Sequence, residues 1–527
     1  MRRTTKRYGI LLAVVCLIAG LIGGCQAIGG VDLNKALLSS FDMKTMEGKG
    51  SVEVSLELDE AALKEAGPDS AAMAAFSQMK LSFDHIKQES TQVASVKGAL
   101  EVAKKSIPFT AYISPEALTV LPEGATKPFT ISTTDLADPT GEGLYDGVDM
   151  KWMTDFQKKA QDPNYIKPLY EYFLGKMPNP SKLKLESGNE TINGQSVYLH
   201  HVRAELDGKD ILPLLRTFIL NLMKDDQAMK AVIAQYYDVI QGAVNSFIPA
   251  DMSGDDELSS VLGAIRSILQ NKEEGVEVVQ TEAKQLLVIL LVMLDSEGTE
   301  VAKFLGDKSS MTVDLYVDNS MQVRKSVANL LLAPTETDGS PLKSIRVKSS
   351  FENWNVNGTV KADAISTAGA LDLMKLDGPE EALEAIKTDS ALYKFLKDDL
   401  HVTRKTGYFY VMPQEDLNEY TAGWAAYSDN GVTMVPARSL AANLDMDLAW
   451  DAASQSVVLT TADGKHSIRL TAGSSKAAVN GAAEISLERP AVVEQGSFYV
   501  PLRSVAEALG ADLHWEAESS SILVTLD

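Results

Sequence analysis

The last quarter of the chain contains the same 26-residue pattern twice. Residues 435–460 and 500–525 align without a gap at an offset of 65 positions, and 13 of the 26 positions are identical. A repeat at a fixed spacing indicates that one supersecondary unit has been used twice. We therefore expect the two copies to form the same elements in the same order.

Each copy predicts a small β-α-β-β module. A strand ends at Val-Pro, and the Pro begins a short helix because its missing N–H costs nothing in the first turn. Gly510 is a good helix stop in the second copy; Asp445 replaces it in the first copy. A strand with the Trp follows, and another strand returns after a polar turn. The repeat motif comprises Pro436, Arg438 and Trp450 in the first copy and Pro501, Arg503 and Trp515 in the second.

The repeated Trp is expected to cap the core between helix and sheet. Truncating a buried Trp costs roughly 3–5 kcal/mol, so Trp515→Ala would unfold the module first. The repeated Arg is expected to pair with a carboxylate or with the Trp face. Binding of an anionic glycan by Arg438 and Arg503 is the alternative.

Further residues around the repeats complete a recognisable frame. Val479-Asn480-Gly481, Pro490 and residues 496–503 fit it together with the two copies. The frame covers residues 407–527 and closely resembles the copper amine oxidase N-terminal-like domain, or stalk domain, of surface proteins of Gram-positive bacteria. The resemblance implies a non-catalytic spacer or a cell-envelope attachment module. The first copy departs from the pattern, because Met434 replaces an aromatic residue.

The family name does not predict an oxidase. Copper needs imidazole or thiolate ligands, and the six His show no spacing that gathers three. The adjacent His200 and His201 point to opposite faces of a strand. The chain has no HExxH, GxSxG, GxxxxGK[ST] or EF-hand motif. We assign no catalytic, cofactor or metal residue; an enzyme with an unrecognised site remains the alternative.

The first 25 residues resemble the signal of a bacterial lipoprotein. Four basic residues precede an apolar run that ends in Leu21-Ile22-Gly23-Gly24-Cys25, as in the lipobox of that family. The resemblance implies cleavage of residues 1–24, lipidation of Cys25 and a tether over residues 25–32 on the extracellular face of the cell membrane. The alternatives are a plain secretory signal and an uncleaved anchor, for which residues 9–24 are shorter than the roughly 20 needed.

Length, charge and cysteine content limit the remaining possibilities. The chain has 527 residues, which predicts two or three domains. Its net charge of −23 argues against nucleic acid as a partner and against an anionic cell-wall polymer unless cations bridge the two. The only cysteines are Cys16, inside the signal, and Cys25. A mature disulfide is therefore excluded.

Residues 33–366 predict an α+β domain. Strand patterns, starting with the alternating residues 50–59, indicate an antiparallel meander with one wet face. Apolar helical stripes follow over residues 210–222, 229–247, 258–269 and 281–305. The nine apolar residues 286–294 predict a buried core helix, with a lid over an apolar cavity as the alternative. Residues 367–403 predict a helical linker.

The layout of residues 33–363 resembles the half-barrel family that includes bacterial lipoprotein carriers. The basis is the strand, turn and strand over residues 314–324 and the helices between strands. The resemblance implies an unclosed antiparallel sheet that wraps helices and holds a lipid or acyl chain in its concavity. The alternative is a packed core without a cavity. A cavity lined by Leu215, Phe218 and Leu290 would favour a carrier.

These observations predict a lipid-anchored, non-catalytic surface protein that combines a binding domain with a wall-associated spacer. A carrier or sensor that holds a lipid or another apolar ligand is the second hypothesis.

Overall fold

The computed structural model separates into two compact units, Met1–Phe395 and Leu396–Asp527. The structure describes residues 30–65, 70–133, 151–160, 162–247, 267–296, 303, 305–335, 341–462, 464–481, 483–516 and 519–526. The predicted signal, Cys25 and most of the predicted helix 258–269 lie outside the described residues.

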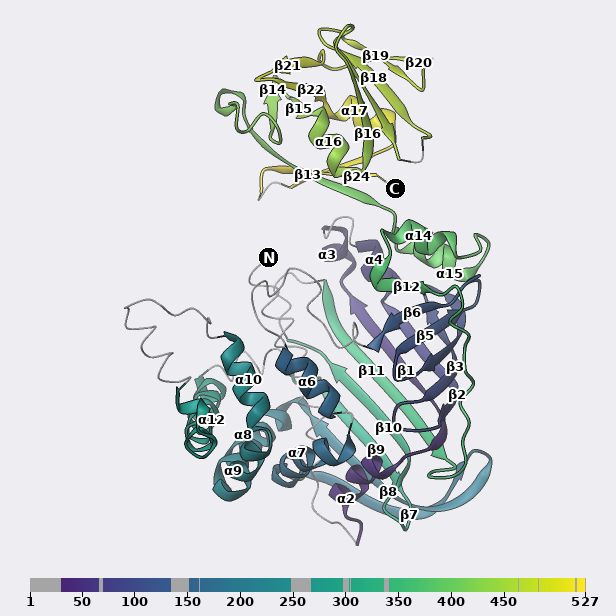
Figure 1. The fold of residues 1–527 in the computed structure, drawn as a ribbon, viewed down its shortest axis with the longest axis vertical. Coiled ribbons are helices and arrows are strands. Elements are labelled where there is room, and N and C mark those ends of the chain that lie inside the picture. Colours follow the sequence, from purple (N-terminus) through teal and green to yellow (C-terminus); the bar gives the residue numbers. More distant parts are fainter. Residues whose placement is uncertain are drawn as a thin grey trace. The chain divides into compact units, whose positions relative to one another are not determined.

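The first unit is built on one twelve-stranded sheet that is not closed into a barrel (Figure 1). The strand order is β12-β6-β5-β4-β3-β2-β1-β11-β10-β9-β8-β7, and all neighbours are antiparallel except β12 and β6. The prediction of an α+β fold with an antiparallel sheet and inserted helices is confirmed. The strands are β1 (Met46–Leu58), β2 (Gln78–Gln88), β3 (Ala94–Val102), β4 (Lys105–Ile113), β5 (Ala117–Pro122), β6 (Phe129–Ser132), β7 (Lys182–Ile192), β8 (Gln195–Asp207), β9 (Ser310–Val317), β10 (Val323–Leu332), β11 (Leu342–Trp354) and β12 (Leu371–Asp372).

Alternation along each strand gives this sheet one apolar and one polar face. Val54 of β1 lies opposite Val347 of β11 on one side and Met79 of β2 on the other. One residue earlier, Glu53 lies opposite Lys348 and forms an ion pair with it at 3.1 Å. Because the period is two, this register places apolar and charged residues on opposite faces.

Two groups of helices enter between strands of this sheet. The helices α6 (Lys151–Ala160) and α7 (Pro163–Lys176) follow β6. The helices α8 (Gly208–Lys224), α9 (Asp226–Gln235), α10 (Tyr237–Phe247) and α12 (Lys272–Ser296) follow β8. Short helices α3 (Glu60–Glu65) and α4 (Ser70–Ala75) separate β1 from β2, and α2 (Leu33–Leu38) precedes β1.

The helices bury only one part of the apolar face. Ile211 of α8 packs with Leu206 of β8, Met311 of β9 and Leu332 of β10 in one core. Leu33 of α2 packs in a second core, with Val202, Leu315 and Val317. Both cores lie on β8–β10. The helices α9, α10 and α12 form a separate core among themselves, with Met229, Ile233, Tyr237 and Val276.

The prediction of a buried core helix over residues 286–294 is wrong. Most apolar side chains in this part of α12 are exposed, Leu286 and Val292 the most. The helix contacts α8 and α9, and within the run 286–294 it is Leu287 that packs against the core of α9 and α10. These neighbours cover one side of α12. A run that is apolar on all sides therefore leaves most of its side chains exposed to solvent.

Much of the predicted linker packs against the first unit. Strand β12 pairs with β6, and the helix α14 (Pro379–Glu384) is followed by a bridge between Ile386 and Ala125. After α15 (Ala391–Lys394), Phe395 contacts Phe76 edge to face at 5.9 Å. The division between the units falls directly after Phe395.

The second unit contains a seven-stranded sheet, β21-β22-β15-β14-β13-β24-β23, and a five-stranded sheet, β16-β17-β18-β19-β20. The predicted β-α-β-β order occurs in both copies. The first copy is β15 (Val432–Pro436), α16 (Ala437–Asn443), β16 (Met446–Asp451) and β17 (Ser456–Thr461), and the second is β22 (Ser497–Pro501), α17 (Leu502–Leu509), β23 (Asp512–Glu516) and β24 (Ser521–Leu526). The other strands are β13 (Lys405–Pro413), β14 (Ala426–Asp429), β18 (Ser467–Thr471), β19 (Lys476–Val479), β20 (Ala483–Ser486) and β21 (Val492–Glu494).

The two copies pair with each other about a local two-fold axis. Val435 lies opposite its equivalent Val500, and Pro436 lies opposite Tyr499 just as Met434 lies opposite Pro501. This reciprocal pairing is the signature of an isologous contact. Buried residues from both copies form one core, including Leu440 and Leu444 of the first and Val505 and Leu509 of the second. Neither copy therefore has a core of its own.

Both helices end in the same backbone conformation. Gly510 adopts a left-handed φ of 75°, and Asp445, at the equivalent position, adopts 52°. A Cβ makes this conformation costly for residues other than Gly. In the first copy Asp445 also forms an ion pair with Lys405 at 3.2 Å. The prediction that each Pro begins its helix is off by one residue: Pro436 and Pro501 are the N-cap residues, and the helices begin at Ala437 and Leu502.

The expectation that the Trp caps the core is wrong in both copies. Trp450 is 48% exposed and Trp515 is 51% exposed. Both lie on strands at the edge of a sheet, β16 and β23, whereas the fully buried side chains come from the inner strands and the helices. Trp450 contacts Phe498 edge to face at 5.6 Å. An edge strand offers a large side chain cover from only one neighbour.

The shared core predicts which substitution destabilises the second unit. Leu509→Ala removes a fully buried side chain and should cost about 2–5 kcal/mol of unfolding free energy. Trp515→Ala removes a half-exposed side chain and should cost no more than about 1 kcal/mol. Leu444→Ala, in the other copy, should lower the same calorimetric transition as Leu509→Ala. A larger effect of Trp515→Ala than of Leu509→Ala would contradict this assignment of the core.

Tyr499 predicts that the second unit loses stability at alkaline pH. Its buried hydroxyl donates to the carbonyls of Ala422 at 3.0 Å and Ala425 at 3.2 Å. Burial raises its pKa to about 12, so above pH 10 the unfolded chain ionises first and stability falls until about pH 12. Denaturant midpoints of Tyr499→Phe should fall less steeply over this range than those of the parent. Equal slopes would contradict the prediction.

Candidate binding site

The apolar face of the sheet remains partly exposed where no described helix covers it. We define the apolar trough as the side chains on this face of β1–β4 and β11: Val52, Val54, Leu56, Leu81, Phe83, Leu100, Phe109, Val347 and Phe351. Every one of them is partly exposed. The cores described above lie on β8–β10. The apolar trough continues the same face onto β1–β4 and β11. Val102 of β3 and Ile107 of β4 lie on this face too but are buried, and α15 contacts β4.

The strand register brings the side chains of the apolar trough together. Val52 lies opposite Leu81 of β2, and Leu81 lies opposite Leu100 of β3. The rings of Phe83 and Phe351 stack at 5.9 Å between centroids, on either side of Gly50. A Cβ at residue 50 would lie 2.3 Å from Phe351 Cδ1. Gly50 therefore allows the two rings to approach each other across β1.

An apolar cavity lies among the helices. It measures about 460 Å³ and is lined by Phe41, Phe156, Ala160, Ile166, Leu169, Tyr170 and Phe173. The rings of Phe41 and Tyr170 contact each other at 4.9 Å. Tyr170 and Phe173 are exposed as well as lining the cavity. This is a second surface at which apolar groups meet solvent.

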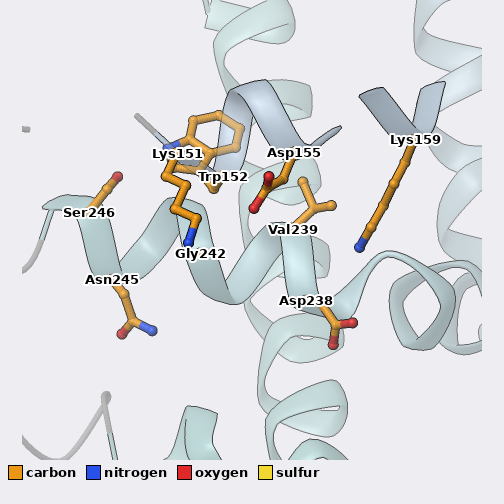
Figure 2. A pocket seen from close by; sticks show the side chains of 9 residues that line it. All are labelled: Lys151, Trp152, Asp155, Lys159, Asp238, Val239, Gly242, Asn245 and Ser246. Atoms are coloured by element: carbon orange, nitrogen blue, oxygen red, sulfur yellow. The ribbon is translucent and has the colours of Figure 1, made fainter. Parts of the chain in front are cut away.

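A more polar cavity of about 310 Å³ is lined by residues of α6 and α10, which contact each other beside it (Figure 2). Lys151, Trp152 and Lys159 reach it from α6, and Asp238 and Asn245 from α10 (Figure 2). Both Trp152 and Asn245 line this cavity, and among the described residues no hydrogen-bond partner is found for the buried Trp152 Nε1 and Asn245 Oδ1 atoms.

The polar face of the same sheet holds a network whose members satisfy one another. The buried Asp314 carboxylate contacts His201 Nε2 at 2.7 Å and the Arg203 guanidinium at 3.4 Å. The His201 ring stacks on Tyr316 at 4.3 Å, and Lys325 Nζ lies 4.7 Å from the centre of the Tyr316 ring. Burial is the main cause that raises the pKa of the Tyr316 hydroxyl. This network ties β8, β9 and β10 together.

The structure separates the predicted motif residues by their surroundings. Pro436 and Pro501 are buried at the pairing of the two copies, whereas Arg438 and Arg503 are exposed. Arg503 lies 3.6 Å from the Glu488 carboxylate. This agrees with a carboxylate partner for the second Arg. The two exposed Trp residues lie on different sheets and form no common site.

Leu215, Phe218 and Leu290, whose shared cavity would favour a carrier, differ in burial in the described structure. Phe218 is buried, but Leu290 is 47% exposed on α12. Phe218 instead packs near Phe173, which lines the apolar cavity, with 6.4 Å between ring centres. Alternation in the sequence predicts the strands of the apolar trough. It does not predict that these strands are uncovered, because alternation indicates which face is apolar and not which helix packs on it.

The described residues contain neither a cluster of metal ligands nor a helix that could span a membrane. Within the ranges that the structure describes, no three His, Cys, Asp or Glu side chains gather in a way that could hold a metal ion. His200 and His201 engage different partners, Ser187 at 2.8 Å and Asp314. Among the described helices, none combines the length and the apolar character needed to cross a bilayer.

Most of the second unit is similar to a known family of domains. Residues 416–524 match the family model of the copper amine oxidase N-terminal domain, so the predicted resemblance is confirmed. This domain is a non-catalytic, stalk-like domain. The comparison with curated proteins found no match.

A solved structure similar to this chain is the lipoprotein LppX of Mycobacterium tuberculosis. The sequences are 10% identical, and the match covers 63% of this chain and 96% of that chain with a TM-score of 0.22. At this TM-score the similarity carries no argument about a ligand or a mechanism.

Proposed function

We propose that this protein is a lipid-anchored protein of the cell envelope whose first unit binds an apolar ligand along the apolar trough. The second unit serves as a non-catalytic spacer or attachment module. The observation that carries the proposal is the apolar trough itself. Nine apolar side chains on neighbouring strands keep contact with solvent although the same face is buried on β8–β10.

The free energy lost by exposing apolar surface to water favours a ligand at this surface. Each Å² of apolar surface left in water forgoes about 25 cal/mol of stabilisation. An alkyl chain that lies across Val54, Leu81 and Phe83 would recover this free energy, and binding sites for small apolar molecules are commonly lined in this way. The chemistry matches a lipid or acyl chain better than a polar metabolite, because no charged residue belongs to the apolar trough.

Anchoring at Cys25 would hold this surface close to a source of such molecules. Val31 is buried in the core of α2, so the body of the first unit begins six residues after Cys25. Six extended residues span at most about 20 Å. An anchor at Cys25 therefore keeps the first unit next to the bilayer, where lipids are abundant.

Two observations support a spacer role for the second unit: its continuous core and its similarity to the copper amine oxidase N-terminal domain. Its core is continuous across both copies, and its family model describes a domain that is not catalytic. The alternative role is attachment to an anionic wall polymer through the exposed Arg438 and Arg503. The net charge of −23 opposes this attachment unless cations bridge the protein and the polymer.

Ligand binding at the apolar trough can be tested with an alkyl-chain fluorophore. Phe83→Asp places a carboxylate in the trough and should weaken binding at least tenfold, because a charged group next to an alkyl chain loses hydration. Ser82→Asp, the neighbouring residue on the polar face, is the matched control and should bind as the parent does. Circular dichroism verifies folding. Equal affinity of Phe83→Asp and the parent would exclude this site.

The anchor has a separate test in the intact mass of the protein extracted from membranes. The mature chain should begin at Cys25 and carry the additional mass of a diacylglyceryl group. Cys25→Ser should abolish this mass, whereas Cys16→Ser, inside the predicted signal, should leave it unchanged. A mature protein whose first residue is Cys25 without an acyl group would contradict the proposed anchor.

A further inference from the structure

We propose that the exposed apolar part of α12 is a second membrane contact, which lies in the surface layer of the bilayer that holds the anchor. The inference rests on the proposed lipid anchoring at Cys25. It concerns a surface separate from the apolar trough and adds a way in which the first unit is oriented on the membrane.

The character of α12 changes abruptly along its length. Its first half carries Glu273, Glu274, Glu277 and Lys284, whereas residues 286–294 contain no polar side chain. In this second half, six apolar residues are exposed by 45–61%. They are Leu286, Val288, Ile289, Leu290, Val292 and Met293. Exposure of this extent on one continuous run marks an interaction surface.

The exposed residues surround most of the helix. At about 100° per residue, their positions cover an arc of about 200°, and Leu287 on the opposite side packs against the core of α9 and α10. Figure 1 shows α12 on the side of the helical group that faces away from the sheet. An amphipathic helix that packs on a protein typically presents a stripe of about 100°. Lipid chains can cover a wider arc because they adapt to the surface.

The length of the apolar run fits a surface location. Nine residues extend about 14 Å along a helix, which is half of the roughly 30 Å of a hydrocarbon core. The charged first half then remains in water. A helix of this kind lies in the interface, with its apolar side buried about 5–10 Å into the boundary between headgroups and acyl chains.

The tether makes this contact an intramolecular event. Cys25 lies six residues before the buried Val31, so the anchor holds the first unit within about 20 Å of the membrane surface. A second weak contact gains from the high local concentration that the first one imposes. The tether therefore raises the concentration of lipid around the exposed apolar residues of α12.

The charges around α12 do not favour electrostatic binding to a membrane, so the proposed contact depends on its apolar side chains. The nearest cations of the region are already paired, Lys284 with Asp226 at 2.5 Å and Arg216 with Asp295 at 3.2 Å. The chain carries a net charge of −23, which repels anionic headgroups. Binding should therefore occur on zwitterionic lipid, should persist at high salt, and should not be strengthened by anionic lipid.

Flotation with phosphatidylcholine vesicles tests the inference. The mature chain with Cys25→Ser, which carries no acyl group, should float with the vesicles at both low and high salt. The double variant Ile289→Asp, Val292→Asp should lower the partition coefficient at least tenfold. Tyr198→Asp, which changes a half-exposed aromatic residue of β8, is the matched control and should float as the parent does. Circular dichroism verifies that each variant is folded.

Three outcomes would overturn the inference. The parent could fail to float, the double variant could float equally well, or the double variant could instead dissociate a dimer seen by analytical ultracentrifugation, which would make α12 a contact between copies of the chain. The vesicle experiment uses unacylated protein, and the acyl mass at Cys25 is measured separately. Failure of the membrane contact and failure of the anchor are therefore distinguishable.

Discussion

The organisation of the first unit follows from one imbalance: the apolar face of its sheet is larger than the helices that cover it. Twelve strands extend this face across the unit. The helices α2 and α8 bury it on β8–β10, and on β3 and β4 Val102 and Ile107 are buried whereas Leu100 and Phe109 stay partly exposed. The alternation that places Leu206 and Leu315 on this face also places Val54, Leu81 and Val347 there. What the helices leave uncovered becomes the apolar trough.

The second unit solves the same problem in the opposite way. Each copy of its repeat is too small to bury its own helix, and the pairing of Val435 with Val500 combines both copies around one continuous core. The result is a unit in which the helices and inner strands of both copies contribute buried side chains to one core. A unit with a complete core suits a spacer, whereas a unit with an uncovered apolar face suits the binding of an apolar ligand. The two units therefore differ in the role that their packing permits.

Local pattern predicted much of this architecture. The alternation in residues 50–59 predicted β1 and its polar face, and the repeat at an offset of 65 predicted the β-α-β-β order of both copies. Asp445, where the first copy departs from the pattern, adopts a positive φ like that of the equivalent Gly510. These features depend on neighbouring residues in one strand or helix, and the chemistry of those residues is sufficient to specify them.

The sequence by itself determined which residues are apolar, on which face of each element they lie, and that one module occurs twice. Only the tertiary structure decided which of these faces are covered. Trp515 is a large apolar residue, yet it lies exposed because β23 is an edge strand. Leu290 belongs to the most apolar run after the predicted signal, yet it faces solvent because α12 meets α8 and α9 along one side. Burial depends on which distant element arrives, and hydrophobicity along the chain carries no record of that neighbour.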